Sequence, residues 1–172
     1  MASLLENLID VLGRETQEYE TLVTFAEQKT PAIVKGDIES LKKITEDEQE
    51  VVGRIQKMEK QRNKFLADIA NVVNRDVETL KLTNLVQMLE SIPDQQQKLI
   101  AVHERLKKTT QSLSELNDRN QMLIADKLEM VNFNLNMIRN LKSAPQTANY
   151  SKDAHENGSV LGIFHGGFDA KQ

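Results

Sequence analysis

The sequence predicts an all-α protein: an elongated antiparallel helical hairpin, or a bundle of three long helices, with coiled-coil-like packing and one short connecting helix. Aromatic residues make up 4% of the 172 residues and tryptophan is absent, so there is little material for a compact globular core. Charged residues make up 28%, and apolar residues recur at steps of three and four over long stretches. Such recurrence is typical of long helices that pack along narrow apolar seams.

The first helix is expected to begin near Ser3 and to end at Gly36-Asp37. Its seam advances by three or four residues, with Glu15 and Lys29 in the two positions that lack an apolar residue. The seam comprises Leu5, Leu8, Leu12, Tyr19, Leu22, Ala26 and Ile33. Because the Gly36-Asp37 connection is short, this helix and the next are predicted to pack antiparallel.

The second helix is expected from about residue 38 to residue 73. Its seam contains Leu41, Ile44, Val52, Ile55, Met58, Phe65, Leu66, Ile69 and Val73. Arg62 also falls in a seam position, and pairing the hairpin from its loop places it roughly level with Asp10. We therefore predict an ion pair or hydrogen bond between Arg62 and Asp10, or between Arg62 and Glu15 one turn along. Its main effect would be to fix the register, because partly exposed pairs add only about 0–1 kcal/mol.

A short helix beginning at Thr83 is predicted to follow, with Leu80 packed ahead of it. Ser91 and Pro93 then resemble the cap and first turn of the last helix, which is expected to reach about Leu141. The seam of that helix comprises Leu99, Val102, Leu106, Leu113, Leu116, Asn120, Leu123, Ile124, Leu128, Val131, Leu135 and Ile138.

Asn120 interrupts this apolar seam. A buried amide without partners costs about 1–3 kcal/mol, and seam asparagines that find partners commonly set register or oligomeric state. Asn120 is therefore either a hydrogen-bonded register residue or a partly hydrated residue at a local shift of the pattern. The residues alone favour neither.

Two regions are predicted: a helical bundle over residues 1–142, and a tail over residues 143–172. The tail is rich in Gly, Ser and Asn and shows no periodicity, which indicates flexibility. It contains one apolar cluster, Val160–Phe164, followed by Phe168. This cluster is expected to bind an export component, to contact a partner or to fold back on the helices.

The last helix is longer than the second, so about residues 130–141 are expected to extend past the bundle. This stretch carries a second apolar stripe, well round the helix from the seam, formed by Met130, Phe133, Met137 and Leu141. A helix that is apolar on two sides normally touches two neighbours. The stripe is therefore either bundle core or a homodimer face, or a partner-binding surface, for which methionines are well suited. Phe164 and Phe168 are secondary candidates for partner contact.

Composition excludes several classes of function. The net charge is −4 with acidic and basic residues interleaved, so no basic face is available for nucleic acid. No cysteine is present for disulfides or thiolate zinc sites, and no apolar run is long enough for membrane insertion. The N-terminal residues show no secretory signal, so a cytoplasmic location is expected.

Residues with catalytic or ligand-binding chemistry are sparse. His103 lies among charged residues of the last helix, and no histidine, serine or carboxylate pattern of an enzyme is recognisable. We predict that the protein is not an enzyme and has no catalytic, cofactor or metal site.

The sequence resembles the FlgN-type flagellar export chaperones over roughly residues 4–141. The resemblance rests on the order and spacing of several motifs: Leu5-x-x-Leu8, Glu15-x-x-x-Tyr19-x-x-Leu22, Ala32-Ile33-x-x-Gly36-Asp37-Ile38-x-x-Leu41, Glu48, Glu59-Lys60-x-Arg62, Thr79-Leu80 and Leu116-Asn117-x-x-Asn120-x-x-Leu123-Ile124.

The resemblance implies a cytoplasmic chaperone that binds the C-terminal helical regions of hook-filament junction proteins similar to FlgK and FlgL. Such a chaperone prevents their premature assembly or degradation. Components of the export gate are further partners that the resemblance implies. In this family the C-terminal region is associated with client contacts, which agrees with the second stripe. The alternative is a homodimeric coiled-coil scaffold or adaptor without a role in export.

Overall fold

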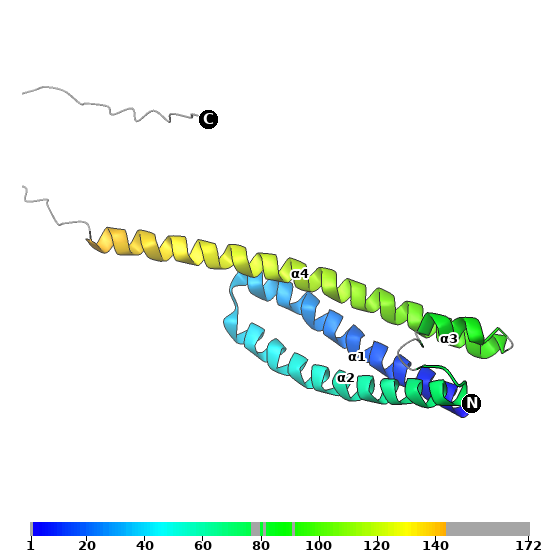
Figure 1. Cartoon of the computed structure of the whole chain (residues 1–172). Coiled ribbons are helices and arrows are strands. Elements are labelled where there is room, and N and C mark those ends of the chain that lie inside the picture. Colours follow the sequence, from blue (N-terminus) through cyan, green and yellow to red (C-terminus); the bar gives the residue numbers. More distant parts are fainter. Residues whose placement is uncertain (1, 77–79, 81, 91, 144–172) are drawn as a thin grey trace, which may run out of the picture. The chain divides into compact units, whose positions relative to one another are not determined.

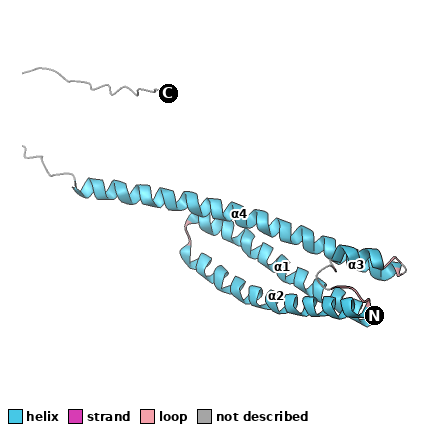
Figure 2. Ribbon diagram, in the orientation of Figure 1, coloured by secondary structure: helices cyan, strands magenta, loops and turns pink. Residues whose placement is uncertain are grey.

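The computed structural model describes residues 2–76, 80, 82–90 and 92–143. These residues form helices joined by short connections, without a strand among them, which confirms the predicted all-α fold (Figures 1 and 2). The chain divides into two compact units, Met1–Leu135 and Asn136–Gln172. The predicted tail, apart from Ser143, lies outside the described residues, so its division from the bundle stays a prediction.

Helices α1 (Ala2–Lys35) and α2 (Ile38–Val72) form the predicted hairpin. Gly36 has a φ of 72°, a left-handed conformation that glycine adopts without steric cost. Asp37 caps α2, since its carboxylate accepts a hydrogen bond from the backbone N–H of Ser40 at 3.0 Å. The same bond lowers the pKa of Asp37. The chain thus ends one helix and begins the next within two residues.

Two further helices follow, α3 (Leu82–Met88) and α4 (Pro93–Ser143). Pro93 is the first residue of α4, as predicted. Thr83 lies inside α3 and does not cap it, because the helix already begins at Leu82. The apolar side of this connecting segment is buried through Leu80, Leu85 and Leu89.

In the first unit α1 runs antiparallel to α2. Glu15 near the start of α1 contacts Arg62 late in α2, whereas Lys29 late in α1 contacts Glu48 early in α2. These cross-helix pairs therefore follow opposite directions along the two helices.

Helix α1 also packs along α4, and these two helices are parallel. The amide of Gln95 donates to the carboxylate of Glu6 at 3.2 Å, and the ammonium group of Lys127 donates to the carbonyl of Val34 at 2.9 Å. The contacts advance in the same direction along both helices, so α1 is the helix shared by α2 and α4 (Figure 1).

The main core of this unit lies where α1, α2, α3 and α4 meet. Its buried residues are Leu5, Leu8, Val11, Leu12, Ile69, Ala70, Leu80, Leu85, Leu89, Leu99 and Leu106. A smaller cluster of Leu22, Val51 and Ile55 lies nearer the hairpin loop.

Two details of the predicted seams are wrong. On α2, Val51 is buried and the predicted Val52 is exposed, because α1 covers only one side of this helix there. On α1, the buried surface is wider than a single seam and includes Val11, Thr16 and Ala32. The extra width follows from contact with two helices on different sides.

Candidate partner-binding surface

The C-terminal part of α4 within the first unit extends past its neighbouring helices. Lys127 bonds to Val34, next to the end of α1, and its side chain lies near Gly36 in the hairpin loop. Every residue from 128 to 135 is exposed. The predicted extension thus exists in this unit, and it begins at Leu128.

This part of α4 is apolar although it is exposed. Phe133 is 68% exposed and Met130 is 59% exposed, and both belong to the predicted second stripe. The seam residues Leu128, Val131 and Leu135 are exposed as well. Large apolar side chains on two sides of an exposed helix are typical of a surface that another molecule covers.

The second unit is described only for its first residues, 136–143, which continue α4. Met137, Ile138 and Leu141 are exposed there. The remaining candidates, Phe164 and Phe168, lie outside the described residues.

Arg62 contacts Glu15 and not Asp10. A guanidinium nitrogen of Arg62 lies 2.7 Å from the carboxylate of Glu15, which is 0% exposed. Asp10 is exposed and pairs with Arg14 of its own helix, at 3.0 Å and one turn away. Of the two predicted partners, the structure therefore gives the one that faces α2.

The environment of Glu15 is unfavourable for a negative charge. Burial raises the pKa of this carboxyl, and nearby Glu59 acts in the same direction, while Arg62 lowers it. One carboxylate oxygen, Oε2, is buried without a hydrogen-bond partner. The contact with Arg62 is thus the interaction that keeps a poorly hydrated carboxylate in the core.

Asn120 is 4% exposed and uses both ends of its amide. Its nitrogen donates to the carbonyl of Ala26 at 2.7 Å, and its oxygen accepts from the hydroxyl of Thr30 at 2.7 Å. All these partners lie on α1. The amide is therefore paired in the core, which removes the penalty of burying it and favours one alignment of α4 on α1.

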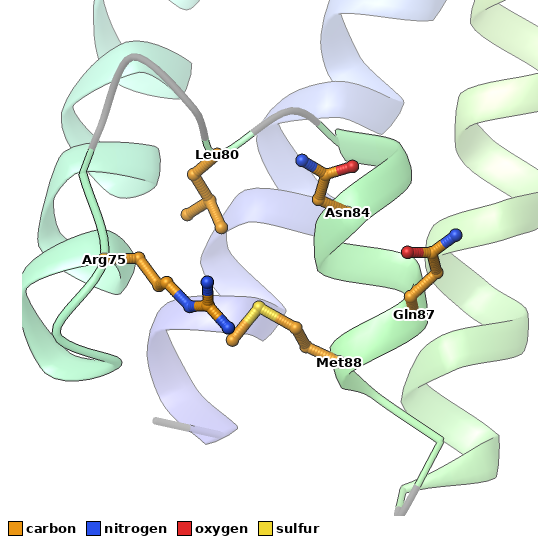
Figure 3. Close-up of a pocket in the computed structure, with 5 residues that line it drawn as sticks. All are labelled: Arg75, Leu80, Asn84, Gln87 and Met88. Carbon is orange, nitrogen blue, oxygen red and sulfur yellow. The ribbon is translucent and has the colours of Figure 1, made fainter.

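A pocket of about 420 Å³ lies between the end of α2 and α3 (Figure 3). It is lined by Arg75, Leu80, Asn84, Gln87 and Met88. Figure 3 shows the guanidinium group of Arg75 directed toward Met88. Among the described residues that line it, none carries a carboxylate, an imidazole or a hydroxyl group.

No cluster of three or more His, Cys, Asp or Glu side chains suited to a metal ion occurs among the described residues. His103 lies 3.8 Å from Glu104, its neighbour in sequence. None of the described helices combines the length and the apolar character that crossing a bilayer requires.

A family model described as FlgN protein matches residues 1–158. No curated protein and no solved structure matches the chain.

Proposed function

Because this chain belongs to the FlgN family of flagellar export chaperones, we propose that it is a cytoplasmic chaperone for hook-filament junction proteins similar to FlgK and FlgL. It binds their C-terminal helical regions and prevents premature assembly or degradation. It then delivers them to components of the export gate. Catalysis has no part in this role.

The observation that supports this proposal is the exposed apolar surface at the end of α4. Within the first unit, Met130 and Phe133 are more than half exposed and lie beyond the last contact of α4 with the hairpin, at Lys127. In the second unit, Met137 and Leu141 are exposed as well. An amphipathic client helix would remove these side chains from water, which contributes about 25 cal/mol for each Å² of apolar surface buried.

The residue types on this surface suit partners that must be held and later released. Residues 130–135 of the first unit contain methionine, valine, asparagine, phenylalanine and leucine, and no charged residue. Methionine side chains adapt to different shapes, and asparagine side chains hydrogen-bond without imposing a charge. Such a surface binds through packing and adapts to more than one client helix.

The test is a binding titration of the full chain with a peptide from the C-terminal helical region of the FlgK-like protein of the same organism. Phe133→Glu places a charge among side chains that the client must bury, so we expect at least about tenfold weaker binding. Met122→Glu is the matched control, because Met122 is, like Phe133, an exposed apolar residue of α4. Equal affinities for the wild-type chain and Phe133→Glu would contradict the proposal.

A second candidate function is a homodimeric coiled-coil scaffold or adaptor. The exposure of α4 on two sides, through Val131 and Leu135 as well as Met130 and Phe133, favours it. Light scattering of the full chain with and without the client peptide distinguishes the two. A stable dimer that the peptide leaves unchanged indicates a scaffold, whereas a complex with the peptide indicates a chaperone.

A further inference from the structure

A groove lies among the three long helices of the first unit, apart from the exposed end of α4. It has a volume of about 330 Å³ and is lined by Leu22, Lys29, Glu48, Val52, Leu113 and Asn117. Leu22 of α1 is buried, whereas Val52 of α2 is exposed and Leu113 of α4 is half-buried. Helix α1 therefore forms the floor, and α2 and α4 form walls with apolar side chains that are not fully covered.

Apart from Glu48, the α2 wall presents uncharged side chains over four turns, with Lys42 and Glu46 beside its end near the hairpin loop. Starting from Val52, the residues three or four positions apart on this side of the helix are Leu41, Thr45, Gln49 and Gln56. Thr45, Gln49, Val52 and Gln56 are exposed. Exposed helix positions normally carry many charged side chains, and 28% of this chain is charged.

The α4 wall has the same character. The residues that follow one another at steps of three or four on the side of Asn117 are Thr110, Ser114, Asn117, Gln121 and Ile124. Of the described residues that line the groove, the charged ones are Lys29 and Glu48, which form an ion pair with each other. The surface that the groove offers is therefore apolar and neutral.

The groove between α1 and α4 on the other side of α4 is different. It has a volume of about 340 Å³, and its lining includes Glu20, Arg105 and Lys108. Walls of mostly uncharged residues thus distinguish the groove lined by Leu22, Val52 and Leu113 from this second groove.

We propose that the neutral groove binds an amphipathic helix of the client, as a fourth helix beside α1, α2 and α4. The buried face of that helix is apolar in its centre and flanked by Ser, Thr, Asn or Gln. The identification of the client as the source rests on the proposed function. A helix with a charged face is disfavoured, because its charge would lose water while the charged residues that line the groove, Lys29 and Glu48, already pair with each other.

The length of the walls sets the length of the helix. From Thr110 to Ile124 the α4 wall extends about 21 Å, at 1.5 Å per residue. A client helix of about four turns fills it, with apolar residues at spacings of three and four. This helix and the segment that covers Met130 and Phe133 occupy separate surfaces.

The test places charges on the walls of the full chain. In Gln49→Lys/Gln121→Lys both positions are exposed, so the fold is retained, and we expect at least about tenfold weaker binding of the FlgK-like C-terminal peptide. The matched control is Gln61→Lys/Gln111→Lys, which adds the same charge at exposed positions outside the groove. Helical content by circular dichroism is measured for both. Equal affinity of the wall variant and the control overturns the inference.

A cross-linking experiment identifies the occupant. The chain has no cysteine, so Gln121→Cys carries a photoactivatable cross-linker at a single place. An adduct with the client peptide supports the inference, whereas an adduct of two chains or a cross-link within one chain overturns it. If Phe133→Glu abolishes peptide binding and the wall charges do not, the inference fails while the proposed function stands. If neither variant changes peptide binding, both fail.

Discussion

Replacing Arg62 by methionine removes the partner of a carboxylate that has no contact with water. Glu15 is 0% exposed, and Arg62 bonds one of its oxygens while the other has no partner. In Arg62→Met the carboxylate keeps its charge without a counter-ion or takes up a proton. Protonating a glutamate of ordinary pKa at pH 7 costs about 3.7 kcal/mol, so the penalty cannot greatly exceed that value.

Part of this penalty is already present in the native protein, because burial raises the pKa of Glu15 even beside Arg62. We therefore expect the free energy of unfolding of Arg62→Met to fall by about 2–3 kcal/mol at pH 7. Since the pKa in the folded state lies above that of the unfolded chain, the folded state binds the proton more tightly. The free energy of unfolding consequently decreases as the pH rises from the unfolded-state pKa to the folded-state pKa of Glu15. Removing Arg62 raises the folded-state pKa further, so this decrease continues to higher pH.

The assay is urea unfolding followed by circular dichroism at two pH values. Near pH 5 Glu15 takes up its proton at a cost of only about 1 kcal/mol, so most of the difference between Arg62→Met and the wild-type protein should disappear. Arg54→Met is the control, since its partner Glu18 keeps some contact with water, and its loss should be smaller. The double variant Glu15→Met/Arg62→Met should regain most of the stability. A loss in Arg62→Met that equals the Arg54→Met loss at both pH values would refute the reasoning.

Three further outcomes are expected. Asn120→Ala removes the hydrogen bonds that this amide makes to the carbonyl of Ala26 and the hydroxyl of Thr30, so urea unfolding should show a loss of about 1–3 kcal/mol. Gly36→Ala should lower the free energy of unfolding by about 1–2 kcal/mol, because φ at this residue is 72°. A gain from Gly36→Ala would contradict this. Phe133→Glu should leave the free energy of unfolding within about 0.5 kcal/mol of wild type, since the side chain is mostly exposed; a larger loss would show that Phe133 is packed in the fold.

The course of the helices was predictable because local signals determine it. In the sequence Gly36 is recognisable as the end of one helix, Asp37 as the cap of the next and Pro93 as the first residue of the last. In the structure Gly36 follows α1, Asp37 caps α2 and Pro93 begins α4. Seam spacing also placed Arg62 near the correct part of α1. It could not decide between Asp10 and Glu15, which lie little more than one turn apart on α1. In the structure Asp10 pairs with Arg14 one turn away.

Other features depend on neighbours that spacing does not reveal. Residues 51 and 52 are both valine, and only the side on which α1 packs decides which of them is buried. Leu128, Val131 and Leu135 follow a seam whose residues Leu99 and Leu106 are buried earlier in α4, and after a shift of the pattern at Ile124 they are exposed. A periodic seam predicts that a helix has a partner but not whether the partner belongs to the same chain. The buried bonds of Asn120 likewise required the actual alignment of α4 on α1.

The parallel course of α1 and α4 has a consequence for biosynthesis. The hairpin contacts Arg62–Glu15 and Lys29–Glu48 join residues 47 and 19 positions apart, whereas Asn120 reaches Ala26 across 94 positions. Closing the shorter loops costs less conformational entropy. The hairpin can therefore assemble while the ribosome is still translating α4. The neutral groove and the register of α4 form only after that helix has been synthesised. The proposed site for a client helix is therefore completed late in synthesis.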